Sequence, residues 1–250
     1  MPTKTIKYWR SKNIRDTKGE VVTCTVRDMF KFLHHTRFNV PSKNKIPVWA
    51  PVSFSGTRSA SNVDMVYCLV LDIDDGYKYI DIHYVLGAKY IYVWHTSYSH
   101  TPELHKWRLV LPLATPVPKD EWLDYWEAGQ IWWEELTGKK TDQVCKDAGR
   151  CYYLKASKDN TYPMGFTAWE GKYLDLSDYV IEVRKEKAYR ARIAADLKRR
   201  QQELIKSLPK EDQERIEKFK KLNSKEARTR KAYEVGATIK DGMARNIKCP

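Results

Sequence analysis

The chain has 250 residues, of which 42% are hydrophobic, and it carries a formal net charge of +13. This length allows one large domain or a domain with an appendage. No apolar run approaches the ~20 residues of a membrane span, which argues against a membrane protein. No apolar leader opens the chain and its five cysteines form no C-x-x-C pair, so we expect a cytoplasmic protein with reduced thiols.

The basic excess is concentrated in one part of the chain. Residues 184–250 contain 21 Lys and Arg against 10 Asp and Glu, a net +11, whereas residues 1–183 carry only +2. Such a charge attracts phosphate backbones, or it can belong to an ordinary solvated helical face. We therefore predict two domains, 1–183 and 184–250, the second a basic helical domain or connector. Its helices are expected at 188–208, 210–222 and 224–235. Because the sequence stops at Cys249-Pro250 without an obvious ending, we expect it to be cut from a longer protein.

The first elements are short. Residues 5–10 and part of 20–26 have strand composition, and Thr25 is placed to cap a helix over 26–35. The stretch 39–64 is rich in Pro, Ser, Asn and Gly. It is interpreted as an extended loop with a strand piece at 48–54, and a long loop inside a compact domain is often functional.

Two features of this first part are candidate binding residues. His34 and His35 end the predicted helix, but consecutive helical residues diverge by about 100° and do not easily share one metal ion. We interpret them as surface or core histidines. Arg58, in the long loop, is either a surface residue or a phosphate contact.

The central stretch is Val66–Gly76, in which an apolar, β-branched run ends in three carboxylates and a glycine. In a strand, side chains alternate between the two faces, so Asp72 and Asp74 project from one face. Two like charges at the end of a buried strand repel each other and resist desolvation. A divalent cation relieves that repulsion, and carboxylate oxygens suit Mg²⁺ or Mn²⁺. A solvated strand end is the competing interpretation.

The elements after the acidic strand alternate between sheet and helix. Residues 79–86 are ambiguous, 90–96 and 107–113 are predicted to be paired antiparallel strands, and 118–136 is the clearest helix. A tryptophan stripe at three- and four-residue spacing marks that helix, and such a stripe is usually core packing. Further strands are expected at 151–154 and 163–169, before 173–183 closes the domain.

Several polar residues follow these strands and complete a pattern. His100 ends the turn Ser97-Tyr98-Ser99-His100, and Thr141-Asp142 brings a third carboxylate, with Asp147 as its rival. Transfer of a nucleotide from a triphosphate requires carboxylates for two metal ions and basic groups that hold the phosphates in line. The basic candidates for triphosphate or template contact are Arg58, Lys106, Arg108 and Arg150.

This pattern resembles the archaeo-eukaryotic primase superfamily, especially the primase-polymerase modules of phage and plasmid replication proteins. The resemblance covers about residues 45–155. It rests on three motifs in order: Val70-Leu71-Asp72-Ile73-Asp74, Ser97-Tyr98-Ser99-His100 and Thr141-Asp142. The strand Trp107–Leu113 and the stretch Asp147–Tyr153 are also similar to their counterparts in such proteins.

The resemblance implies an α+β catalytic core with a mixed, RRM-like sheet flanked by helices. It implies a DNA primase-polymerase in which Asp72, Asp74 and Asp142 hold two Mg²⁺ or Mn²⁺ ions and His100 contacts the triphosphate. The implied partners are a single-stranded DNA template and primer, a dNTP or NTP, and a helicase module in the same longer chain, and the implied location is the host cell cytoplasm.

Two rival functions remain open at this point. In a non-catalytic DNA-binding replication initiator the carboxylates are merely structural, whereas a metal-dependent nuclease uses the same carboxylates without a triphosphate. Glycosyl transfer, which also uses D-x-D, is disfavoured because nothing in the chain resembles a sugar-nucleotide domain.

Overall fold

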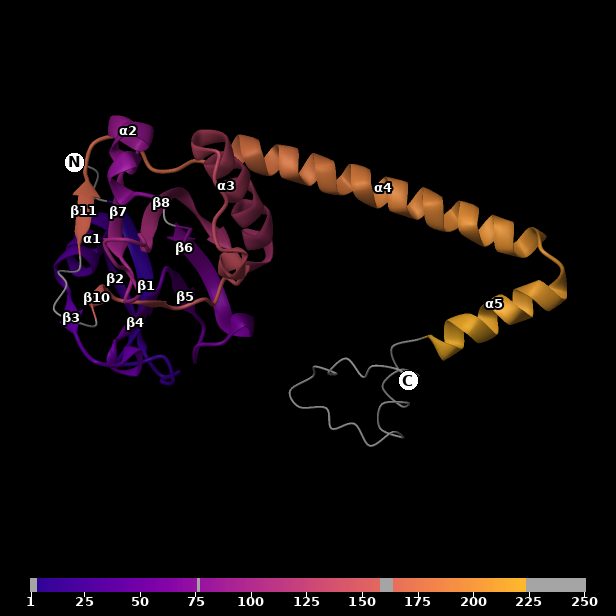
Figure 1. Cartoon of the computed structure of the whole chain (residues 1–250), viewed down its shortest axis with the longest axis horizontal. Helices are drawn as coiled ribbons and strands as arrows, with labels where there is room; N and C mark the ends of the chain where they lie inside the picture. The colour runs from indigo at the N-terminus through magenta and orange to yellow at the C-terminus, as the bar shows by residue number, and fades with distance from the viewer. Residues whose placement is uncertain (1–3, 76, 158–163, 224–250) are drawn as a thin grey trace. The chain divides into compact units, whose positions relative to one another are not determined.

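A computed structural model describes residues 4–75, 77–157 and 164–223, and in these the protein is an α+β structure with antiparallel sheets (Figure 1). Gly76 and the helix expected at 224–235 lie outside the described residues. The helices are α1 (Val26–His35), α2 (Ile82–Leu86), α3 (Trp122–Thr137), α4 (Ser177–Ser207) and α5 (Lys210–Leu222). No helix in the described part of the chain is both long and apolar enough to cross a membrane.

The larger sheet has five strands in the order β11-β7-β8-β6-β5. All pairings between its five strands are antiparallel, and the parallel contact of β8 is an isolated bridge between Leu113 and Leu174, so the expected mixed sheet is wrong here. The strands β6 and β7 do run in the same direction, but β8 lies between them and pairs with both. The strand bounds are β5 (Val52–Phe54), β6 (Val63–Ile73), β7 (Tyr92–Thr96), β8 (Trp107–Pro118) and β11 (Gly165–Ala168).

A second antiparallel sheet, in the order β2-β1-β4-β9, lies beside the first. The two sheets are joined directly, because the strand piece expected at 48–54 divides at Pro51 into β4 and β5, which belong to different sheets. Parallel strand pairing occurs between β3 and β10. The remaining strands are β1 (Thr5–Ser11), β2 (Glu20–Thr25), β3 (Phe38–Asn39), β4 (Val48–Ala50), β9 (Tyr152–Tyr153) and β10 (Ala156–Ser157).

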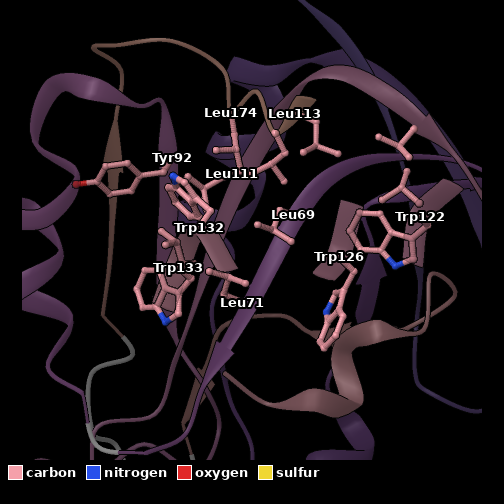
Figure 2. Packing of buried hydrophobic residues seen from close by; sticks show 14 of the residues in the cluster. Leu69, Leu71, Tyr92, Leu111, Leu113, Trp122, Trp126, Trp132, Trp133 and Leu174 are labelled. Carbon is pink, nitrogen blue, oxygen red and sulfur yellow. The ribbon is translucent and has the colours of Figure 1, made fainter. Parts of the chain in front are cut away.

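Strand β6 runs through the middle of the hydrophobic core and is apolar on both faces. Leu69 and Leu71 pack with the buried tryptophans of α3, whereas Val70 packs with α1. Figure 1 shows α1 and α3 on opposite sides of β6, and Figure 2 shows tryptophans of α3 beside Leu69 and Leu71. The alternation expected for a strand places Asp72 on the α1 face of the sheet, next in the row after Val70.

Several predicted helix signals are confirmed. The Thr25 hydroxyl accepts a hydrogen bond from the backbone N–H of Asp28 and caps α1. Helix α3 ends at Gly138, whose φ of 67° is in the left-handed region that favours glycine. The ambiguous segment 79–86 is helical, a 3₁₀ turn η3 (Tyr79–Asp81) followed by α2.

The chain forms two compact units, Met1–Glu186 and Lys187–Pro250. Helix α4 begins before this boundary, earlier than the helix expected at 188–208. Val180 and Val183 on its first turns are buried, and Arg184 pairs with Glu121 at 2.6 Å and with Asp124 at 2.9 Å. The change in composition near 184 therefore falls inside a helix, since the first turns of α4 pack on the core and the later turns carry exposed charges.

We expect Trp133→Ala to lower the free energy of unfolding by about 3–5 kcal/mol, because it leaves a cavity beneath the sheet. Trp133 is 0% exposed. Leu123 is on the same helix and 47% exposed, so Leu123→Ala is the matched control and is expected to cost under about 0.5 kcal/mol. Urea unfolding of the two variants makes the comparison. Equal losses of unfolding free energy in the two variants would contradict the burial of Trp133 in the core.

Candidate active site

The first element of the site is an ion pair across two neighbouring strands. Asp72 on β6 stands directly opposite Arg108 on β8, with Arg108 Nε 3.2 Å from Asp72 Oδ1. Arg108 Nη2 also donates to Asp72 Oδ2 at 3.4 Å, and Nη1 donates to the Tyr153 carbonyl at 3.0 Å. The two charged side chains are only 7% and 8% exposed. Each charge is therefore stabilised mainly by the other.

Asp74 lies just past the end of β6 and is half exposed. Lys106 Nζ lies 4.0 Å from Asp74 Oδ2. Burial raises the pKa of Asp74, and the negative charges of Asp72 and Asp142 raise it further, while Lys106 and Arg108 act in the opposite direction. Asp74 therefore lies within electrostatic reach of both other candidate carboxylates.

Asp142 is held beside the acidic strand by its backbone. Its N–H donates to the carbonyl of Asp72 at 3.3 Å, and Arg150 Nη2 lies 3.8 Å from its Oδ2. Asp147 differs in its surroundings, since its Oδ1 accepts from the N–H of Gly149 at 2.9 Å and closes a local turn. The geometry thus groups Asp142 with Asp72 and Asp74, and gives Asp147 a turn-forming contact.

His100 is oriented by the chain that returns to β8. The backbone N–H of Lys106 donates to His100 Nδ1 at 3.2 Å. This hydrogen bond assigns the proton to Nε2, which is then a donor. Burial lowers the pKa of His100, and the neighbouring His105 lowers it further. The ring is therefore neutral at pH 7. Tyr79 contacts both rings, with centroids 5.9 Å from His100 and 4.9 Å from His105.

Lys43 is a cation at the site that sequence reasoning missed. It belongs to the 3₁₀ turn η1 (Lys43–Lys45) in the long loop, and its Nζ lies 4.8 Å from the centroid of the Tyr153 ring. Burial lowers the pKa of Lys43; the charges of Arg108 and Arg150 act in the same direction, and those of Asp72 and Asp74 oppose them. In the sequence, two features could have indicated this cation: the length of the loop and its two lysines at positions 43 and 45.

Arg58, the loop residue singled out in the sequence, is placed elsewhere. Its Nη2 donates to the carbonyl of Ile14 at 2.6 Å, its Nη1 to Cys151 Sγ at 3.4 Å, and its guanidinium lies 5.6 Å from the Trp9 ring. These contacts tie the loop to the four-stranded sheet. Among the described residues, the cations near the carboxylates include Lys43, Lys106, Arg108 and Arg150.

The carboxylates suit a hard cation in chemistry but are not arranged as a finished metal site. Asp72, Asp74 and Asp142 offer only oxygen ligands, which Mg²⁺ and Mn²⁺ prefer. As the side chains lie, no three His, Cys, Asp or Glu residues in the described part of the chain are close enough to hold an ion. The oxygens of Asp72 and Asp142 face arginines instead.

No family model matches the sequence, and no curated protein matches it. A solved structure of the AEP domain of the cyanophage S-2L primase-polymerase is similar over 72% of this chain and 88% of that chain, with 15% sequence identity and a TM-score of 0.40.

We expect Arg108→Met to destabilise the protein by about 3–5 kcal/mol, because it leaves the Asp72 carboxylate buried without its partner. The matched change Lys106→Met removes a cation from a half-exposed pair at 4.0 Å and is expected to cost less than about 1 kcal/mol. Guanidinium unfolding at pH 7 measures both. Similar small losses would mean that the Asp72–Arg108 pair does not hold the strands.

We expect Asp74→Asn to stabilise the protein at neutral pH. The folded-state pKa of Asp74 is raised by burial and by Asp72. The folded state therefore binds the Asp74 proton more tightly than the unfolded chain, and stability falls as pH rises through the interval between the two pKa values. Melting curves are measured from pH 3 to 8. The melting temperature of the variant should rise relative to that of the wild type through that interval, and above it the difference should stay constant. An unchanged or lower melting temperature at pH 7 would contradict this.

Proposed function

We propose that this protein is a metal-dependent nucleotidyltransferase that synthesises primers or extends DNA on a single-stranded template. The observation that supports this most is that Asp72, Asp74 and Asp142 lie around the end of β6 together with Lys43, Lys106, Arg108 and Arg150. A triphosphate brings negative charge, and cations beside metal-binding carboxylates balance that charge. The order of the motifs, which resembles the archaeo-eukaryotic primases, points to the same chemistry.

The proposed roles follow from position. Asp72, Asp74 and Asp142 would hold Mg²⁺ or Mn²⁺, which when bound lowers the pKa of an attacking hydroxyl and balances charge on the leaving pyrophosphate. Lys43, Lys106 and Arg150, which are less buried than Arg108, would bind the phosphate oxygens. The 3′ oxygen of a primer, or of an initiating nucleotide, would bond to the α-phosphorus as the bond to pyrophosphate breaks.

His100 would act as a neutral hydrogen-bond donor to the triphosphate. Its Nδ1 already accepts the Lys106 N–H, so Nε2–H is the available donor. Burial lowers the pKa of His100, which favours this neutral, donating form of the ring. Arg108 would act indirectly, by fixing the position of Asp72.

One observation favours a second candidate, a DNA-binding initiator without catalytic activity. Asp72 and Asp142 each face an arginine, and carboxylates with a purely structural role form the same kind of pair. The two candidates differ in what they predict for metal-dependent synthesis, and a nuclease differs from both because it degrades the template.

We expect metal-dependent incorporation of labelled dNTP on a single-stranded template, with and without an annealed primer. Asp74→Asn should lower the rate on the order of 10²–10³-fold, because it removes a charged ligand from the reacting centre. Asp75→Asn is the matched control, since Asp75 is exposed and its Oδ1 accepts the Tyr77 N–H at 3.0 Å. Lys43→Gln should raise KM for dNTP about tenfold, whereas Lys45→Gln on the same turn should not.

Three outcomes would count against the proposal. Intact DNA binding without synthesis in any metal would favour the initiator, and a degraded template would favour the nuclease. Equal activity of Asp74→Asn and Asp75→Asn would remove the acidic strand from the reaction. Products without a primer would identify a primase within the proposed class.

We further propose that the basic residues after 184 contact the template backbone or position a helicase module in a longer chain. A protein shortened to residues 1–186 keeps the Arg184 ion pairs and ends at the boundary between the two units. It should bind single-stranded DNA more weakly than the full chain, with a smaller dependence on salt. Equal affinity and equal salt dependence would rule out this role.

A further inference from the structure

Two tyrosines lie in the segment between the acidic strand and α2, and they pack in different directions. Tyr77 contacts the core, since its ring centroid lies 6.3 Å from that of Trp107 and 6.1 Å from that of Trp133. Its carbonyl also accepts a hydrogen bond from Trp107 Nε1–H at 2.7 Å. Tyr77 therefore anchors this segment to the hydrophobic core between β8 and α3.

Tyr79 packs toward the turn that carries the candidate histidine. Its ring stacks on that of Trp94, a buried residue of β7, with the centroids 4.5 Å apart and the planes at 29°. The same ring lies 4.9 Å from the His105 ring, and it meets the His100 ring edge to face at 5.9 Å and 66°. Tyr79 thus contacts both a buried tryptophan of the sheet and the two imidazoles of the turn.

The His100 ring needs neighbours that fix its orientation. The χ2 torsion of histidine is broad and roughly two-fold, so the backbone alone does not decide where each ring nitrogen faces. The hydrogen bond from the Lys106 N–H to Nδ1 selects one orientation, but at 3.2 Å it lies at the long end of the usual range. The rings of Tyr79 and His105 pack edge to face against the His100 ring at 5.9 and 5.4 Å, and such contacts oppose its rotation.

The ring of Tyr79, rather than its hydroxyl, makes the contacts with the histidines. The hydroxyl donates to Met164 Sδ at 3.2 Å, and a thioether sulfur is only a weak acceptor. Removing the hydroxyl should therefore leave the histidine contacts in place, whereas removing the ring should release them.

We propose that Tyr79 is a positioning residue of the candidate active site. Its ring holds His100 in the orientation in which Nδ1 accepts the Lys106 N–H and Nε2 carries the proton that is donated to a phosphate oxygen. The inference rests on the proposed function for the identity of the ligand, a nucleoside triphosphate, and not for the orientation of the ring. Tyr79 acts through His100 and needs no contact with the ligand.

The first measurement is two-bond ¹H–¹⁵N NMR of the histidine side chains at neutral pH, with the His100 signals assigned by their loss in His100→Asn. The wild type should show a neutral His100 ring with its proton on Nε2. In Tyr79→Leu the two ¹⁵N shifts of His100 should move closer together and the Lys106 amide should exchange faster, because the ring then turns and both tautomers are populated. Tyr79→Phe should keep both quantities at their wild-type values.

Tyr77→Leu is the matched control, since it removes the same kind of ring from the same segment. In the described part of the chain, the aromatic contacts of Tyr77 are with Trp107 and Trp133. The control should lower the melting temperature, because it disturbs the core, and leave the His100 signals unchanged. Melting temperatures of all variants show that each is folded.

A second measurement tests whether Tyr79 acts through His100. The quantity is the affinity for dTTP in the presence of Mn²⁺, measured by calorimetry. Tyr79→Leu and His100→Asn should each weaken binding about tenfold, and the double variant should bind no more weakly than His100→Asn alone.

Unchanged His100 signals in Tyr79→Leu would overturn the inference, as would equal changes in Tyr77→Leu. Additive losses of dTTP affinity in the double variant would also overturn it, because Tyr79 would then contact the ligand itself. A wild-type protein that does not bind dTTP would refute the proposed function, and the NMR comparison alone would then decide the role of Tyr79.

Discussion

The buried ion pair between Asp72 and Arg108 is the constraint on which the candidate site depends. An aspartate at this position of a central strand is costly to bury unless a cation faces it. Arg108 meets that need from the neighbouring strand, and its Nη1 also reaches the Tyr153 carbonyl of the other sheet. One guanidinium therefore holds the first carboxylate in place and ties the two sheets together beneath the site.

The rest of the site surrounds this pair with groups that are more exposed and more easily moved. Two longer contacts form this rim, Lys106 with Asp74 at 4.0 Å and Arg150 with Asp142 at 3.8 Å, and their side chains are partly exposed. Such pairs are worth little individually and can exchange partners at small cost. A rigid centre with a loosely paired rim is suited to binding a cation and a phosphate chain together, since the rim can release its own partners as they enter.

The sequence predicted those parts of the site that depend on local order. Strand alternation was enough to group Asp72 with Asp74, and turn composition placed His100 after β7. Lys43 was missed because it approaches the carboxylates only through the pairing of distant segments, which no local pattern encodes. The resemblance implied a mixed sheet. This prediction was wrong because β8 lies between the two strands that run in the same direction, β6 and β7. The start of α4 was missed because its first turns are apolar and its later turns basic.

The central proposal is that the end of β6 binds a divalent cation together with a nucleotide. Electron paramagnetic resonance of Mn²⁺ tests it most directly, because the signal of free Mn²⁺ falls when the ion binds to protein. We predict that the wild-type protein removes this signal in the presence of a dNTP, and that Asp74→Asn does so at least tenfold more weakly than Asp75→Asn. An unchanged Mn²⁺ signal with the wild-type protein, or equal binding by both variants, would contradict the account.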